Sequence, residues 1–476
     1  MKAKIVVPTD LWEQTAAHVL RDSSEHLAFM LCGYARGTTT YRLTARKLIL
    51  VDDQDLEMGH RYGLALKLDR LVSVMNEANR EALALVEVHG HPSSSGDVSF
   101  SAIDKQGQRE LAAYLRDVAK GVPYGALVLG ERAVEGAIWL PGVARPSSVE
   151  EVNAIGDTLS RYRCSGAAKR ARDSTRRPEE RFQRQVLAFG DAGQGAIRAS
   201  RVAIVGLGGI GSIVGQQLAH LGVESFLLID PDLVESSNLN RLVGSTVDDV
   251  DTPKVEVARR MLRRISPAAQ VDALAVDVRT LDALQALVDV DVVFGCVDTD
   301  AARLILTEFA AAHLTPLIDA GVGIFAEAGR ISEAGGRVTV YTPGRPCLKC
   351  SKDFNSRIAA EELESDVERE YRLARGYVTG ANVPEPSVIS LNGVIASLAV
   401  TELMALLTEF RPTVHYSYYD LLDQKVGRRI VKQDGSCVVC GIAGLGSLAG
   451  VERYAKTGLP TDLPDSGTGT RRRGQD

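Results

Sequence analysis

A glycine-rich turn that follows an apolar segment constrains the fold of this 476-residue chain more than any other feature. Gly206, Gly208 and Gly211 have the spacing G-x-G-x-x-G, between the apolar run RVAIV and the segment IVGQQLAHL, which has helical periodicity. Glycines, here including Gly209, let the backbone turn sharply and approach a phosphate, and the amides at the start of the next helix attract anions. Because a second apolar run, SFLLI, follows the helix, the segment predicts a βαβ unit with a nucleotide at the sheet edge.

Length and composition indicate a globular α/β protein of at least two domains. Hydrophobic residues make up 45% and charged residues 24% of the chain, and 476 residues exceed one ordinary core. The net charge of -6 gives no general reason to expect a nucleic-acid partner. The first residues lack the pattern of a signal peptide, so we expect a cytoplasmic protein. The apolar stretch 386–407 contains Asn392 and Glu402, which favours a buried helix over a membrane span.

The pattern along the chain predicts four parts. Residues 1–145 alternate short apolar runs with helical stretches and predict a small α/β domain. Residues 146–178 are polar and rich in arginine, and predict a basic linker. Residues 179–445 carry the glycine turn and further apolar strands, and predict a Rossmann-like domain with a mostly parallel sheet. Residues 446–476 predict a partly disordered tail.

Acidic and cationic residues follow the predicted strands of this domain in a fixed order. An aspartate at the end of the second strand can accept hydrogen bonds from ribose hydroxyls. A dehydrogenase has no need of the cations that come next, although the glycine spacing alone permits NAD, FAD or ATP, and a nicotinamide-dependent oxidoreductase stays open. The candidate residues are Asp230, Asp232, Asn238, Arg241, Lys254, Asp298 and Arg303.

This ordered set resembles the ThiF/MoeB/HesA adenylyltransferases and the adenylation domains of ubiquitin-activating enzymes, over about residues 180–443. The resemblance implies ATP-dependent adenylation of the C-terminal glycine of a ubiquitin-like or sulfur-carrier protein. It also implies that Asp230 holds the ribose, Asp298 holds Mg²⁺, and Asn238 helps to position the nucleotide.

The same resemblance assigns cationic residues to the triphosphate. Arg241 and Lys254 would neutralise its charge, together with Arg184 in the segment RFQRQVLAFGDAGQG. Arg184 resembles the arginine that reaches into the nucleotide site of the other subunit, so the resemblance implies a homodimer.

Four cysteines predict a structural zinc site. Cys347 and Cys350 form one C-x-x-C pair, and Cys437 and Cys440 form another. Two such pairs can close a tetrahedral zinc site, whereas redox disulfides or free thiols are the alternatives. The long separation matches the zinc site of MoeB-like enzymes, where the metal joins the crossover segment to the C-terminal region.

Between Cys350 and Cys437 the sequence contains no cysteine that could carry a thioester. Three alternatives remain: the acyl-adenylate leaves as such, a hydroxyl such as that of Ser351 takes the acyl group, or a downstream protein supplies the thiol. Of the isolated cysteines, Cys296 is interpreted as a buried strand residue, and Cys164 lies in the predicted linker.

The N-terminal segment VEVHGHPSSSGDVSFSAID contains a second candidate metal site. His89 and His91 project to one side of a predicted strand end, and Ser101 and Asp104 lie at the predicted start of a helix. The pattern resembles the JAB/MPN metalloproteases, in which two histidines and an aspartate hold catalytic zinc. Glu25 lies where that family places its general base.

That resemblance implies hydrolysis of a peptide or isopeptide bond. Zinc would lower the pKa of a bound water, Glu25 would relay its proton and Ser101 could stabilise the oxyanion. The serine and Asp104 lie about two residues later than in the commonest spacing, so Asp97 is an alternative ligand. A purely binding domain is the alternative function.

Together the two resemblances predict an enzyme that trims or deconjugates a carrier protein and activates its tail with ATP. We favour a bacterial ubiquitin-like conjugation pathway, with a conjugating enzyme as a further partner, because both domains share one chain. Activation for sulfur transfer, with a sulfur donor, is the alternative within the family. A non-catalytic scaffold for ubiquitin-like proteins is an alternative of another class, and neither nucleic acid nor membrane is an expected partner.

Overall fold

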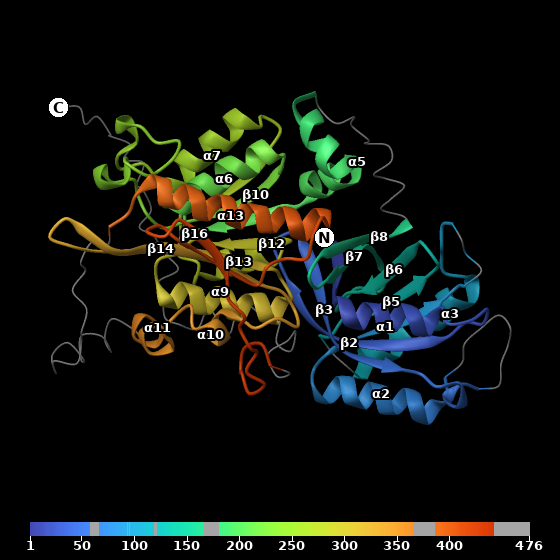
Figure 1. Ribbon diagram of the computed structural model, residues 1–476. Helices are drawn as coiled ribbons and strands as arrows, with labels where there is room; N and C mark the ends of the chain where they lie inside the picture. The colour runs from blue at the N-terminus through green and yellow to red at the C-terminus, as the bar shows by residue number, and fades with distance from the viewer. Residues whose placement is uncertain are drawn as a thin grey trace, which may run out of the picture.

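The computed structural model describes residues 1–57, 66–92, 94, 96–118, 121–165, 180–364 and 386–441. Two eight-stranded sheets lie side by side, one built from the N-terminal part of the chain and one from the remainder (Figure 1). We call the described residues up to 165 the first unit and those from 180 onward the second unit.

In the first unit, β1 pairs with both β3 and β7, so the sheet closes on itself. Its strand order is β1-β3-β2-β4-β5-β6-β7-β8. One hydrophobic cluster lies between the sheet and α1, and a second lies beneath α2 and α3. The elements are β1 (Lys2–Pro8), α1 (Thr9–Val19), β2 (Leu27–Arg36), β3 (Thr40–Leu50), α2 (Leu68–Arg80), β4 (Ala84–Gly90), α3 (Ala102–Val118), β5 (Tyr124–Leu129), β6 (Val134–Trp139), β7 (Ser147–Ile155) and β8 (Leu159–Arg163).

The predicted basic linker, residues 146–178, is wrong over its first half. β7 and β8 pair with each other, and β7 also pairs with β1 and β6. Val149, Val152 and Ala154 of the segment SSVEEVNAI belong to the first core, but the two glutamates between the valines break the alternation expected of a strand. Cys164, placed in the linker from sequence, is buried at the end of β8. Residues 166–178 lie outside the described part of the chain.

The sheet of the second unit is parallel in one half and antiparallel in the other. Strands β11, β10, β9, β12 and β13 run parallel, whereas β14, β15 and β16 are added as antiparallel neighbours. Among the described residues, four of the seven strand pairings are parallel, so the prediction of a mostly parallel sheet is confirmed, with an antiparallel edge added to it. The strands are β9 (Arg201–Val205), β10 (Ser225–Ile229), β11 (Gln270–Leu274), β12 (Val292–Gly295), β13 (Leu317–Glu327), β14 (Arg330–Tyr341), β15 (Tyr416–Asp420) and β16 (Lys425–Arg428).

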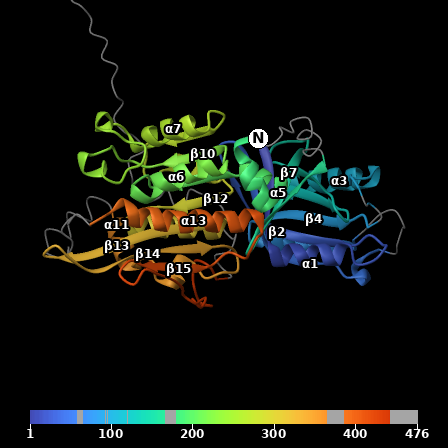
Figure 2. The ribbon, with the colours of Figure 1, turned by 45° about the horizontal axis from the view of Figure 1, so that its top comes forward.

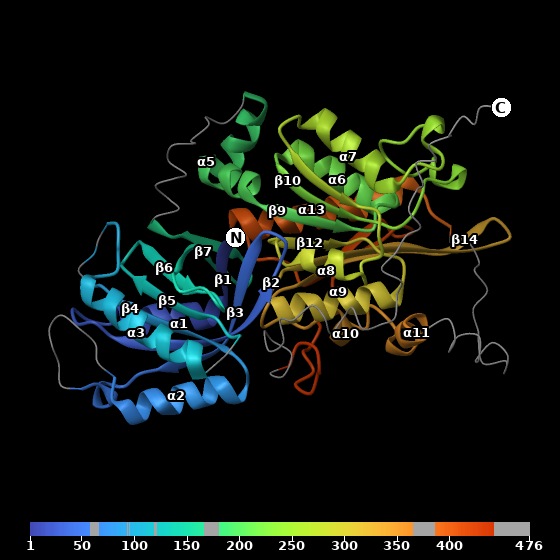
Figure 3. The same cartoon turned by 180° about the vertical axis from the view of Figure 1, so that it is seen from behind.

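Helices cover both faces of this sheet (Figure 3). α5, α6, α7 and α13 contribute to the core on one face, and α8 and α9 to the core on the other. The helices are α5 (Gln183–Ala199), α6 (Gly209–Leu221), α7 (Lys254–Ile265), α8 (Leu281–Leu287), α9 (Asp300–His313), α10 (Leu348–Ser351), α11 (Ser356–Glu362) and α13 (Ile389–Thr408).

The apolar stretch 386–407 forms nearly all of α13, which is long and apolar enough to cross a membrane by length and composition. In this structure it lies beside α6 and packs on β13 and β14 (Figure 2). Glu402 is buried, but it accepts hydrogen bonds from both terminal nitrogens of Arg411 and from the backbone amide of Val414. The helix therefore has the surroundings expected of a core helix.

Two buried aspartates of the second unit hold the first unit in place. Asp289 accepts hydrogen bonds from the backbone amides of Thr39 and Thr40, each at 2.9 Å, in the turn between β2 and β3. Asp291 accepts from Lys4 at 3.0 Å and from Arg161 at 3.1 Å. Both aspartates are only 3% exposed, so a polar, desolvated interface joins the two units.

Candidate functional site

The glycine turn lies where three parallel strands meet. Gly206 follows β9, donates its amide hydrogen to Ile229 O of β10, and has a φ of 86°. A Cβ atom on Gly206 would lie 2.4 Å from Cys296 O, beyond β12, and one on Gly211 would lie 1.9 Å from Gly206 O. Larger residues cannot fit at either position without moving backbone, so the turn requires the glycines that the sequence supplies.

Asp230 connects the end of β10 to the glycine turn. Its carboxylate accepts hydrogen bonds from the backbone amides of Leu207, at 2.6 Å, and Asp232, at 2.8 Å. Burial raises the pKa of Asp230 above its usual value, and the charge of Lys254 and these two hydrogen bonds offset this only in part. The side chain is thus fixed at the place that the sequence predicts for ribose recognition.

The predicted cationic residues lie beside Asp230 and already have partners within the chain. Lys254 Nζ lies 2.7 Å from Asp232 Oδ2, and Arg241 Nη1 donates to Ser237 O at 2.6 Å. Asn238 is buried and its side-chain oxygen accepts a hydrogen bond from Glu235 N, so it shapes the short helix Ser236–Asn238.

Asn392 is a residue of this site that sequence reasoning missed. A Cβ atom on Gly209 would lie 2.2 Å from Asn392 Nδ2 and 3.5 Å from Arg241 Cδ, so α13 brings Asn392 to the start of α6. Asn392 is 1% exposed, and its side-chain oxygen has no hydrogen-bond partner within the described residues. An asparagine in the first turn of a long apolar helix was the signal that could have identified it.

Asp298 and Arg303 follow β12, next to the glycine turn. Asp298 is exposed, and Arg303 Nη2 donates to Val297 O at 2.7 Å. Arg184 is exposed on α5, and its predicted reach into a second subunit stays a prediction. After β9 the chain adds β10 and β11 on one side of it and then β12 and β13 on the other, so the strand order reverses at β9, which is where open α/β sheets bind ligands.

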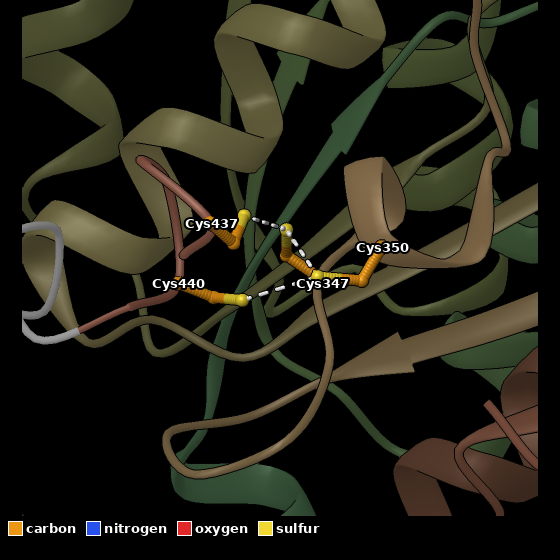
Figure 4. Close-up of side chains that lie close together, drawn as sticks. All are labelled: Cys347, Cys350, Cys437 and Cys440. Carbon is orange, nitrogen blue, oxygen red and sulfur yellow. Dashed lines mark hydrogen bonds between the residues drawn. The ribbon is translucent and has the colours of Figure 1, made fainter. Parts of the chain in front are cut away.

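The four cysteines belong to two segments that are far apart in the sequence, and their side chains lie close together in space (Figure 4). The Sγ atoms of Cys347 and Cys437 are 3.7 Å apart, and those of Cys350 and Cys440 are 3.5 Å apart. A tetrahedral ion with bonds of about 2.3 Å requires sulfur atoms about 3.8 Å apart. The cluster, three of whose members are buried, therefore fits Zn²⁺, which would join the segment after β14 to the segment after β16.

Two nucleophile candidates from the sequence are unsuited to acyl transfer. Ser351 is 1% exposed and its hydroxyl bonds to Asp353 and to backbone carbonyls of α10, so the suggestion that it accepts the acyl group is wrong in this conformation. Cys296 lies just after β12 and is half-buried, rather than being the buried strand residue expected from the sequence, and loss of solvent raises the pKa of its thiol, which makes it a poor nucleophile.

The first unit brings its predicted metal ligands together as well. His89 Nε2 and His91 Nε2 lie 3.5 and 3.6 Å from Asp104 Oδ2. Ligand atoms about 3.4 Å apart suit a tetrahedral ion with bonds of about 2.1 Å. Among the described residues, His89, His91 and Asp104 form the group that could hold a metal ion. Asp97, the alternative ligand, does not belong to this group. Burial opposes ionisation of Asp104, but its hydrogen bond with His89 prevails and holds the pKa of this carboxyl below its usual range.

Glu25 and Ser101 flank this group. Leu27 on β2 lies opposite His89 on β4, so Glu25 lies opposite His91, with its carboxylate 3.4 Å from His91 Nε2. Ser101 Oγ accepts a hydrogen bond from Asp104 N at 3.1 Å, and Asp104 accepts one from Ser101 N at 2.6 Å. Ser101 therefore caps α3 and orients Asp104, and its oxyanion role stays a prediction.

With this geometry established, comparison with known proteins identifies the second unit. The sequence pattern of the ThiF family matches residues 182–449, more than half of the chain. The chain belongs to the ThiF family. The molybdopterin-synthase adenylyltransferase of Escherichia coli is 31% identical over 55% of this chain and 96% of its own length.

Two further relatives match the ThiF-family region of this chain over nearly their own whole length. The SAMP-activating enzyme E1 of Haloferax volcanii is 27% identical over 60% of this chain and 96% of its own. The sulfur carrier protein ThiS adenylyltransferase of E. coli is 30% identical over 55% of this chain and 94% of its own. The second unit is therefore an adenylyltransferase domain of the ThiF/MoeB type, whereas residues 1–181 lie outside the family match.

Proposed function

We propose that the second unit uses ATP to adenylate the C-terminal carboxylate of a ubiquitin-like or sulfur-carrier protein. The observation that carries the proposal is the convergence of the glycine turn, Asp230, Lys254 and Asp298 at one edge of the sheet, in a chain of the ThiF family.

The reaction needs the charges that lie at this edge. A carboxylate oxygen attacks the α-phosphorus, the bond to the β-phosphate breaks, and pyrophosphate leaves with its charge while the acyl-adenylate forms. Asp230 would hold the ribose, Asp298 would hold Mg²⁺, and Lys254 and Arg241 would exchange their present partners for phosphate oxygens. Mg²⁺ would supply positive charge against the triphosphate.

The test is mass spectrometry of small carrier proteins after incubation with ATP, Mg²⁺ and the full chain. A mass increase equal to AMP on one carrier supports the proposal, and Asp298→Ala removes it. Asp282→Ala, which changes an exposed carboxylate on α8, is the matched control. Binding of NADH without binding of ATP would instead indicate an oxidoreductase and overturn the proposal.

A second proposed function concerns the first unit, which we infer to be a zinc peptidase that trims or deconjugates the same carrier. The proximity of His89, His91 and Asp104, with Glu25 beside His91, supports it. Bound zinc would lower the pKa of a water molecule, and Glu25 is placed to take the proton of that water.

Metal analysis and cleavage together test this peptidase. His91→Ala should lower the zinc content by one ion per chain and abolish cleavage of a carrier extended beyond its terminal glycine. Glu25→Gln should abolish cleavage but keep the zinc, because Glu25 is assigned the proton and not the metal. His220→Ala, on the exposed side of α6, is the control. Zinc binding without cleavage by the unaltered protein would leave the first unit a binding module.

The pathway and the assembly are proposals too. We favour conjugation, with a homodimer in which Arg184 reaches the partner's nucleotide. An isopeptide-linked product after addition of a conjugating enzyme would support this, whereas a thiocarboxylate formed with a sulfur donor would indicate sulfur transfer. Mixing Arg184→Ala with Lys254→Ala chains should restore part of the activity if the sites are shared between subunits.

A further inference from the structure

A hollow of about 460 Å³ lies in the first unit, between α2, α3 and the sheet. Leu27 and Phe29 on β2 and Glu87 on β4 belong to its floor. His89 and Asp104 line it as well, so the hollow reaches the histidine group of the proposed peptidase. Its volume lies within the range of about 300–1,000 Å³ that is usual for ligand pockets. The hollow is thus large enough to hold a side chain of a substrate bound at this group.

The walls of the hollow are apolar and belong to the two helices. Among the side chains that line it, those of Leu68, Val72, Ile103 and Tyr114 are exposed to solvent. Exposed apolar side chains that gather around a hollow are typical of a surface that binds a ligand. We therefore expect a ligand with an apolar part that packs against these walls.

The charge of the hollow is negative. Its charged residues are Glu87, Asp104 and Glu110, and the described residues that line it include no lysine or arginine. A divalent ion in the histidine group would be balanced by Asp104 and by Glu25, which lies 3.4 Å from His91. Glu87 is half-buried and would keep a charge without a counter-charge in the hollow. Because such a charge costs free energy, a positively charged ligand would be stabilised beside it.

Gln108 on α3 is a further polar residue of this hollow, and it lies beside Glu87. Its side chain is 2% exposed, and its Nε2 has no hydrogen-bond partner within the described residues. Buried amides normally have partners, and the amide oxygen can accept a hydrogen bond once the group turns about its last bond. A cation beside Glu87 would therefore find a second acceptor in Gln108.

The spacing along β4 sets the length of a suitable ligand. Glu87 and His89 are two residues apart and lie on the same face of the strand, so their positions are about 7 Å apart. An extended lysine side chain spans about 6 Å from Cα to Nζ, given carbon–carbon bonds of about 1.5 Å. A residue whose backbone lies at the histidine group can therefore bring a terminal ammonium or guanidinium group to Glu87.

We propose that this hollow binds the side chain of a lysine or arginine that directly follows the scissile bond of the substrate, with Glu87 as the partner of its charge. The inference rests on the proposed peptidase function and names its substrate class. The residue before the bond is the terminal glycine of the carrier, which has no side chain, so the residue after the bond fills the hollow. Its aliphatic stem packs against the apolar walls while its charged end reaches Glu87.

The experiment measures binding of fluorescein-labelled decapeptides to full-length Glu25→Gln protein loaded with zinc, which should bind a substrate without cleaving it. Each peptide has a central Gly-Gly that is followed by lysine, norleucine or glutamate, and fluorescence anisotropy gives the affinities. The lysine peptide should bind at least about tenfold more tightly than the norleucine peptide, because norleucine keeps the stem but lacks the charged donor. The glutamate peptide should bind most weakly.

Two further substitutions in the Glu25→Gln protein test the hollow itself. Glu87→Gln should remove the preference for lysine and leave the norleucine affinity unchanged, which also shows that the hollow is intact. Gly107→Leu should weaken binding of both peptides, because Gly107 lines the hollow and a Cβ atom there meets nothing within 4 Å, so the new side chain would fill the space. The matched controls are Glu13→Gln, on the exposed side of α1, and Gly195→Leu, on α5.

The outcomes separate this inference from the proposed function. Equal binding of the lysine and norleucine peptides, including no binding of either, overturns the inference, and tighter binding of norleucine assigns the hollow to an apolar side chain and also overturns it. A loss of the lysine preference in Glu13→Gln would indicate attraction to the overall charge and overturn it as well. Cleavage of the lysine peptide by the unaltered protein is measured separately. Absence of cleavage with a retained lysine preference sinks the peptidase proposal and supports the hollow as a binding site.

Discussion

The candidate sites of the two units differ in how much of the chain each needs. In the first unit, His89, His91 and Asp104 lie within 16 residues, and Glu25 joins them through one strand pairing. In the second unit, the nucleotide edge draws on segments from Gly206 to Asn392, and Cys347 pairs with a cysteine 90 residues away.

The two predicted metal sites differ in the same way. The four-cysteine cluster offers four protein ligands and is largely buried, as expected of a closed structural site. The histidine group offers three ligands, so a tetrahedral ion held there would have one position left for water, as the proposed catalytic role requires. We therefore expect loss of a ligand in the four-cysteine cluster to unfold part of the chain. Loss of a ligand in the histidine group should lower activity alone.

The largest effect should come from Cys437→Ser. Loss of one of four zinc ligands should lower the free energy of unfolding by on the order of 5 kcal/mol, because the metal joins two distant segments. Thermal unfolding with zinc analysis measures this. Val438→Ala, an exposed position between the two cysteines, is the control. A Cys437→Ser protein of unchanged stability would remove the contrast between the two metal sites.

Asp291→Asn should have the next largest effect, because it leaves the buried Arg161 without its ion-pair partner and leaves Lys4 with Glu151 alone. We expect a loss of about 4 kcal/mol in the free energy of unfolding, measured with denaturant. Asp272→Asn, which affects an exposed ion pair with Arg201, should lose less than about 1 kcal/mol. Equal losses in the two variants would show that the interface is not desolvated.

The same aspartate predicts an acid limit to stability. Burial by itself raises the pKa of Asp291, but the charges of Lys4 and Arg161 outweigh it and hold the pKa below its usual range. The stability from this carboxylate is therefore present above about pH 4, the pKa in an unfolded chain, and is lost as the pH falls further. Unfolding midpoints should fall more steeply below pH 4 in the unaltered protein than in Asp291→Asn.

Gly209→Ala tests whether α13 completes the nucleotide site. The new methyl group would collide with Asn392 Nδ2 and crowd Arg241, so we expect ATP affinity to fall by about 2 kcal/mol, roughly thirtyfold. Gly393→Ala, where a Cβ atom meets nothing within 4 Å, should bind ATP normally. Isothermal titration decides the matter, and normal ATP binding by Gly209→Ala would exclude Asn392 from the site.

His91→Ala should have the smallest effect on folding. The side chain is 17% exposed and belongs to an open group, so the free energy of unfolding of the metal-free protein should change by less than about 1 kcal/mol. ATP binding should not change. A loss as large as that from Cys437→Ser would make the histidine group structural too.

The sequence predicts the glycine turn and the local histidine group well because each lies in one continuous segment with a fixed spacing. It does not predict β7 and β8, because two adjacent glutamates interrupt the apolar alternation of β7, and β1, the partner of β7, lies at the other end of the first unit. Asn392 was missed for a related reason: its place in the site depends on packing against Gly209, and no local pattern encodes such a long-range contact.

The hydrogen bonds that Thr39 and Thr40 donate to Asp289 have a consequence for the kinetics of the two proposed reactions. Since this contact is buried, we expect the described residues of the two units to keep their relative positions, so that the two proposed sites would not move together to pass on a substrate. If the first unit trims the carrier as proposed, the carrier would have to leave it and bind again at the second unit. We therefore expect the overall flux through trimming and activation to respond to dilution, as in two enzymes that share a solution.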